Sequence, residues 1–273
     1  MELSRRDLLR LSGLLAAGAA LSGCGPVYRE LAGPQAAPQG WLPPGPAGDS
    51  GATFQALSRL TFGPNPEERQ HVAEIGLEAW IEEQLALELL DDGPASLLVR
   101  HLDTLSLDAN ELVALSDKLF DGQGRQTAPA QLREATLLRQ VYSRRQLNEV
   151  MVEFWTDHFN VSVEKGDCWF LKTVDDREVI RPHALGSFRE LLWASAHSPA
   201  MLVYLDNQSN HKGAPNENYA RELMELHTLG VDGGYGQQDV MELARCLTGW
   251  TIKEHFWRGD FSFEDDLHDG EPK

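Results

Sequence analysis

The stretch "NENYARELMELHTLG", residues 216–230, has the pattern of an amphipathic helix and carries three glutamates, one arginine and one histidine. At about 100° per residue, Asn218, Glu222 and Glu225 fall on one polar arc of this helix. His227 falls near the middle of the opposite, apolar arc. The helical phase therefore predicts that His227 and the glutamates cannot bind one ligand together from this helix, and that its apolar arc packs against other helices.

A second stretch, "EVMVEFWTDHFN" at residues 149–160, repeats this arrangement. His158 lies near the centre of a wide apolar arc, and Glu149 and Glu153 lie on the other side. Two readings stay open for His158 and His227. Each is an ordinary core histidine bonded to a backbone carbonyl, or both face one interior site as ligands of a divalent metal or as an acid/base pair.

A carboxylate partner for the two histidines would have to come from a neighbouring helix end or loop, and Asp157 and Asp206 are the candidates. The polar arc of 216–230 also has two readings. Arg221 and Glu225 are spaced as an exposed i, i+4 ion pair, or the polar arc lines a cleft beside "YLDNQSN" at 204–210. The candidate catalytic residues are His158, His227, Glu222 and Asn218, with Asn216 in the cleft and with His158 and His227 as the candidate metal ligands.

Helical patterns continue through the chain from about residue 52. Asn65 is a predicted N-cap with Pro66 at the first helical position, and Gly76 is the predicted C-cap. "SRRQ" at 143–146 lies inside a helical pattern, and only 255–263 has a strand-like pattern. Helices are predicted over 65–76, 77–87, 95–105, 109–120, 129–159, 169–180, 187–197, 199–205, 217–229 and 237–248. The expected fold is mainly α, an irregular multi-helix bundle with little or no β structure.

The N-terminus, "MELSRRDLLRLSGLLAAGAALSGC", has a charged start and an apolar run too short to span a bilayer. Arg5 and Arg6 form the arginine pair of a twin-arginine signal. The residues before Cys24 resemble a lipobox, after which the cysteine is acylated. Residues 1–23 are therefore predicted to be an export signal, with an amphipathic first helix as the alternative.

Residues 24–51 are rich in proline and glycine and are predicted to form a tether, followed by one helical domain over 52–273. Hydrophobic residues make up 42% and charged residues 24% of the chain, as in soluble globular proteins. The net charge of −18 excludes nucleic acid and anionic membrane surfaces as main partners, because both require a basic face. The expected location is the periplasmic side of the cell envelope, at a membrane, through a lipid on Cys24.

Two cysteines remain, Cys168 and Cys246, and they form either a disulfide or two buried free thiols. The glycine-rich "GVDGGYG" at 230–236 follows a helix and lacks a Lys-Ser/Thr pair, which predicts a helix C-cap and not a phosphate loop. No G-x-S-x-G elbow and no H-E-x-x-H pair occurs, so the sequence gives no motif for a serine hydrolase or a zincin.

Several long motifs together resemble the bacterial DUF1800 family, a domain of unknown function. They are "LSRLTFGPNPEE", "EFWTDHFNV", "DREVIRPHALGSFRELLWASAHSPAMLVYLDN", "PNENYARELMELHTLGVDGGYGQQDVMELARCLTGW" and "FSFEDDLHDG". The resemblance runs from about residue 54 to the end. It implies an exported protein, a DUF1501-like partner similar to sulfatases and alkaline phosphatases, and further chain beyond the point that matches Lys273. The family has no established catalytic residues, so it assigns no roles.

Two function classes follow from these observations. One is a cell-envelope enzyme, a metal-assisted or acid/base hydrolase that uses the inward-facing histidines. The other is a non-catalytic envelope lipoprotein that binds or assembles a partner such as the DUF1501-like protein. Whether His158 and His227 share a site separates the two classes.

Overall fold

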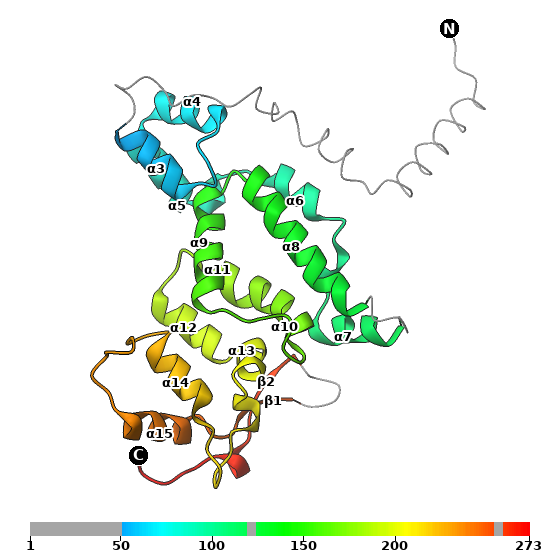
Figure 1. Cartoon of the computed structure of the whole chain (residues 1–273). Coiled ribbons are helices and arrows are strands. Elements are labelled where there is room, and N and C mark those ends of the chain that lie inside the picture. Colours follow the sequence, from blue (N-terminus) through cyan, green and yellow to red (C-terminus); the bar gives the residue numbers. More distant parts are fainter. Residues whose placement is uncertain (1–50, 119–123, 254–258) are drawn as a thin grey trace, which may run out of the picture. The chain divides into compact units, whose positions relative to one another are not determined.

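A computed structural model describes residues 51–118, 124–253 and 259–273. Over these residues the chain is mainly helical with one small two-stranded sheet, which confirms the predicted fold class (Figure 1). Arg5, Arg6, Cys24 and the tether lie outside the described residues. No helix in the described part combines the length and apolar character needed to cross a bilayer.

The described residues group into two compact units within the region expected to be one domain. The first unit runs to Leu102 and includes Leu138–Gln146, and the second comprises Asp103–Leu137 and Leu147–Lys273. In chain order the elements are α3 (Ala52–Leu60), α4 (Pro66–Ile75), α5 (Leu77–Leu85), η1 (Leu87–Leu89), α6 (Gly93–Val99), η2 (Asp103–Leu105), α7 (Ala109–Lys118), α8 (Gly124–Tyr142), α9 (Gln146–His158), α10 (Cys168–Asp175), η3 (Asp176–Ile180), α11 (Arg181–His183), α12 (Phe188–Ala196), α13 (Pro199–Tyr204), η4 (Asn207–Ser209), α14 (Glu217–Glu225), α15 (Gln237–Cys246), β1 (Trp250–Ile252), β2 (Phe261–Phe263) and η6 (Asp265–Leu267).

In the first unit, helix α4 begins and ends at the predicted capping residues. The Asn65 side chain accepts a hydrogen bond from the Glu68 backbone N–H at 2.8 Å, which satisfies one free donor of the first turn of α4. Gly76 ends α4 with a φ of 87°, a conformation that glycine adopts without steric cost. A small apolar cluster of Leu57, Val72 and Trp80 forms the core beneath these helices.

The long helix predicted over 129–159 is broken at residues 143–145, so the prediction that "SRRQ" lies within a helix is wrong. The Ser143 hydroxyl donates to the Asp92 carboxylate at 3.0 Å. The Arg145 guanidinium donates to the Leu90 backbone carbonyl at 3.0 Å. These bonds to a distant segment compensate for the helical bonds that the break removes.

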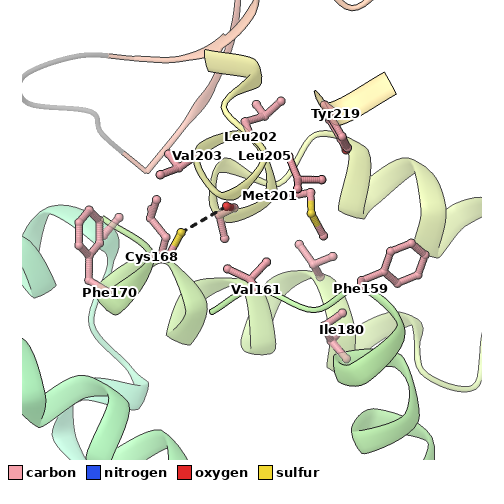
Figure 2. Packing of buried hydrophobic residues seen from close by; sticks show 14 of the residues in the cluster. Phe159, Val161, Cys168, Phe170, Ile180, Met201, Leu202, Val203, Leu205 and Tyr219 are labelled. Carbon is pink, nitrogen blue, oxygen red and sulfur yellow. Dashed lines mark hydrogen bonds between the residues drawn. The ribbon is translucent and has the colours of Figure 1, made fainter. Parts of the chain in front are cut away.

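The second unit contains the main core, drawn in Figure 2. Phe159, Phe170 and Tyr219 are buried there among aliphatic side chains. Both cysteines are free. Cys168 is buried and its thiol donates to the Ala200 carbonyl (Figure 2). Cys246 is exposed, because it lies on the outer face of α15, so the prediction of two buried thiols holds for Cys168 alone.

Charged groups are also buried in this unit. The Arg181 guanidinium forms ion pairs with Glu149 at 2.9 Å and Asp176 at 2.8 Å. Asp176 begins the π-helix η3, so helical phase alone does not place it. Glu149, predicted to lie opposite the apolar arc of its helix, is nevertheless buried, because Arg181 packs against it as an ion-pair partner.

The sheet is a single antiparallel pair. Trp250 lies opposite Phe263, and Ile252 lies opposite Phe261. The strand-like stretch predicted over 255–263 thus contains β2, whereas its partner β1 comes before that stretch. Residues 254–258 lie outside the described part.

Candidate functional site

His158 is the last residue of α9, and its ring is fixed by one hydrogen bond. Its Nε2–H donates to the backbone carbonyl of His227 at 3.1 Å. A carbonyl oxygen can only accept, so Nε2 carries the proton. Nδ1 is therefore the nitrogen of neutral His158 that can accept a proton.

His227 lies just beyond α14, which ends at Glu225 and not at 229 as predicted. Its backbone N–H donates to the Glu222 carbonyl at 3.0 Å, five residues back. This widened turn, followed by Gly230 with a φ of 83°, ends the helix. The His227 side chain is buried, with 5% of its surface exposed. Burial of His227 was predicted from helical phase. In the structure His227 lies beyond the helix, and the turn directs its side chain inward.

The two imidazole rings lie together, with 6.2 Å between their centroids. Four aromatic side chains surround them. Phe159 lies 4.6 Å from the His158 ring and 5.2 Å from the His227 ring. The other three are Trp155 at 5.5 Å, Phe188 at 6.2 Å and Phe154 at 6.3 Å from His158. The site is thus an imidazole pair in an aromatic setting.

Burial sets the charge of His227. Removal from water disfavours the imidazolium form of His227, and a positive charge on His158 disfavours it further. Together they lower the pKa of His227 from 6.5 to about 4. His227 is therefore neutral at pH 7.

The carboxylates proposed as partners lie elsewhere. Asp206 pairs with the Lys165 ammonium at 2.7 Å and has a left-handed φ of 61°. Asp157 is exposed. Among the described residues, no carboxylate hydrogen-bonds either imidazole, and no three His, Cys, Asp or Glu side chains group as they would around a metal ion.

A family model described as "Protein of unknown function (DUF1800)" matches residues 55–273, which is most of the chain. The chain belongs to the DUF1800 family. No curated protein and no solved structure matches it. All four candidate site residues of this DUF1800 protein lie within the matched range.

The polar residues of the DUF1800 protein have structural contacts. The Asn218 amide donates to the Leu205 carbonyl at 3.1 Å, and the Asn216 backbone N–H donates to the Asn210 side chain at 2.9 Å. Both contacts join the start of α14 to the 204–210 segment. The Asn218 side-chain amide and the Asn216 backbone N–H thus make hydrogen bonds within the protein, and Asn218 holds the start of α14 in place.

Glu222 is linked to His227 through its backbone carbonyl and not through its carboxylate. Arg221 forms ion pairs with Glu225 at 3.4 Å and Glu217 at 3.0 Å, so the predicted i, i+4 pair with Glu225 is confirmed. The structure therefore brings His158 and His227 together and leaves Glu222 and Asn218 outside the imidazole pair.

Sequence reasoning did not identify Phe188 or Trp155 as parts of the site. Trp155 could have been found, since it lies three residues before His158 on the same arc of α9. Phe188, the first residue of α12, is brought to His158 by tertiary packing, which no local spacing reports.

Proposed function

We propose that this DUF1800 protein is an exported, lipid-anchored protein of the cell envelope, and that His158 is the acid/base group of a hydrolase. The observation that carries the catalytic part is the hydrogen bond from His158 Nε2 to the His227 carbonyl. An oriented imidazole whose second nitrogen can take up a proton is the usual general base.

The carbonyl of residue 227 acts as the group that orients the base. It fixes the His158 ring and accepts from Nε2–H in both the neutral and the charged imidazole. Nδ1 can then take a proton from water or from a substrate hydroxyl and return it to a leaving group. The His227 side chain beside it is neutral at pH 7, so the pair does not hold two positive charges at that pH.

The donor set favours acid/base chemistry over metal binding. Catalytic zinc sites commonly use three protein ligands. The pair offers two imidazoles, and Nε2 of His158 is already bonded to a carbonyl. The metal content of the purified protein should therefore be measured as well. A stoichiometric metal that is lost when either histidine is replaced would show a metal site and refute the acid/base proposal.

Substitution of the histidines tests the catalytic proposal. The substrate is a carboxylic, phosphate or sulfate ester that the wild-type protein hydrolyses. His158→Gln removes the base and should lower the rate of this hydrolysis by about 10²–10⁴-fold. His227→Gln keeps the backbone carbonyl, so the orienting bond survives and the loss should be much smaller. His197→Gln is the matched control, because His197 also bonds a carbonyl among aromatic rings but lies outside the pair. A folded His158→Gln protein with unchanged activity would refute the role.

Export and anchoring rest on the sequence, with Arg5 and Arg6 in the signal and Cys24 as the acylated residue. Labelling of cells with a radioactive fatty acid should mark the wild-type protein and not the Cys24→Ala variant. Arg5→Lys/Arg6→Lys should leave the chain in the cytoplasm. A wild-type protein without label would contradict the anchor.

The aromatic setting favours a second candidate function, a non-catalytic lipoprotein that binds a DUF1501-like partner. Phe154 and Phe188 are 53% and 43% exposed beside His158, and exposed aromatic groups are common in binding surfaces. Phe154→Ser/Phe188→Ser should then weaken co-elution with the partner, whereas His158→Gln should not. If both variants bind the partner like wild type, this candidate fails.

A further inference from the structure

Figure 1 shows the connection between α14 and α15. Three large aliphatic side chains within six residues of this connection are exposed. Leu226 is 61% exposed, Leu229 is 56% exposed and Val231 is 70% exposed. Single exposed aliphatic residues are ordinary, but three within six residues are unusual and indicate a surface that binds an apolar partner.

The loop is held in this form by its backbone. The N–H groups of Leu229 and Gly230 both donate to the Met224 carbonyl, at 2.9 and 3.1 Å. His227, which lies between the exposed residues in the sequence, is buried against His158 and Phe159. This loop thus buries its polar imidazole and presents its aliphatic side chains, the reverse of the usual distribution.

The first six residues of this connection are uncharged, and the acidic residues Glu225 and Asp232 flank them. Residues 226–231, "LHTLGV", contain no Lys, Arg, Asp or Glu. His227 is neutral at pH 7, because burial lowers its pKa to about 4. An aliphatic loop without charge can enter a lipid hydrocarbon region at little electrostatic cost, whereas a chain of net charge −18 is repelled by anionic lipid.

We propose that residues 226–231 insert into the surface of an uncharged lipid bilayer. The inference rests on the proposed lipid anchor for its choice of partner. From Cys24, residues 25–51 would reach roughly 30 Å as a coil and at most about 90 Å when extended. A chain tethered at this length stays close to the bilayer, so lipid is the apolar partner with the highest local concentration.

The test uses the mature chain from residue 24 with Cys24→Ser, so that no acyl group contributes, and vesicles of phosphatidylcholine. Flotation should show that this protein binds the vesicles. The variant Leu226→Ser/Leu229→Ser/Val231→Ser should bind at least about tenfold more weakly, because it loses most of the apolar area of the loop. Leu89→Ser/Leu137→Ser is the matched control, with 73% and 62% exposed leucines elsewhere, and should bind like the parent.

A second measurement does not depend on the triple variant. An environment-sensitive dye on Leu229→Cys, in a Cys246→Ser background, should shift to the blue on addition of vesicles, and the same dye on Leu89→Cys should not. A parent protein that does not float, or equal binding of parent and triple variant, would overturn the proposal. Loss of a bound protein partner with unchanged vesicle binding would assign the loop to that partner and would also overturn it. Fatty-acid labelling of Cys24 is independent of these results, so failure of the anchor is seen separately.

Discussion

Replacing Arg181 by Met should destabilise the protein far more than replacing Arg221 by Met. Each arginine pairs with two carboxylates, Arg181 with Glu149 and Asp176, and Arg221 with two glutamates of α14. They differ in burial. The side chain of Arg181 is 16% exposed and that of its partner Glu149 is 5% exposed, whereas the side chain of Arg221 is 36% exposed.

The magnitudes follow from this difference. Removing Arg181 leaves two buried carboxylates without a counter-charge, and loss of one partner of a buried pair costs about 3–5 kcal/mol. An exposed i, i+4 pair is worth about 0.3–0.5 kcal/mol, so Arg221→Met should cost under about 1 kcal/mol. With an m-value of about 2 kcal/mol/M in urea, Arg181→Met should lower the unfolding midpoint by roughly 2 M.

Urea unfolding followed by circular dichroism measures both shifts. A double-mutant cycle sharpens the test, because Glu149→Gln should destabilise the wild type but stabilise the Arg181→Met protein by removing one uncompensated charge. Equal midpoints for Arg181→Met and Arg221→Met would refute the reasoning. So would a Glu149→Gln effect of the same sign in both backgrounds.

Three further outcomes are expected. The pKa of His227 is lowered to about 4 in the folded protein, so the unfolded chain binds a proton first on acidification. The free energy of unfolding should therefore fall by up to roughly 3 kcal/mol between pH 6.5 and 4. His227→Gln should flatten this part of the stability–pH curve, and an unchanged curve would contradict the lowered pKa of His227. In a Cys24→Ser background, Cys246 should react rapidly with a thiol reagent, and Cys168 should react only on unfolding, since burial raises its pKa to about 12; mass spectrometry of this folded protein should find Cys246 alone modified, and early labelling of Cys168 would contradict its burial. Gly249→Ala should cost roughly 1–3 kcal/mol, because Gly249 has a φ of 79° and an added Cβ would lie 2.6 Å from a carbonyl oxygen; Gly213→Ala, with a φ of 89° in open space, should lower the melting temperature less, and equal losses would show that steric contact is unimportant.

Local chemistry made much of the fold predictable. Asn65, Pro66 and Gly76 mark the ends of α4 because capping and φ preferences act within a few residues. The apolar arcs predicted the mainly helical class, since a helix must bury such an arc. The burial of His227 was predicted from the same pattern, but His227 lies beyond the end of α14 and is directed inward by the turn that follows the helix.

Long-range partners explain the errors. The break after Tyr142 depends on Asp92 and Leu90, which the sequence of 129–159 does not reveal. The burial of Glu149 was not predicted, because its partner Arg181 lies 32 residues further along the chain. A hydrogen bond from His158 to a backbone carbonyl was one of the two readings of the sequence, and the structure contains one. Which carbonyl accepts it could not be predicted, because backbone acceptors leave no residue-type signal.

The central claim is that His158 and His227 form one oriented imidazole pair. An NMR pH titration of ¹⁵N-histidine-labelled protein, assigned with His158→Gln and His227→Gln, tests it directly. At pH 7 the spectra should show His158 with its proton on Nε2, and His227 neutral with a pKa of about 4 that rises only in part when His158 is replaced, because burial is the larger cause of the shift. A proton on Nδ1 of neutral His158, together with a His227 that titrates near 6.5 whether or not His158 is present, would contradict the pair.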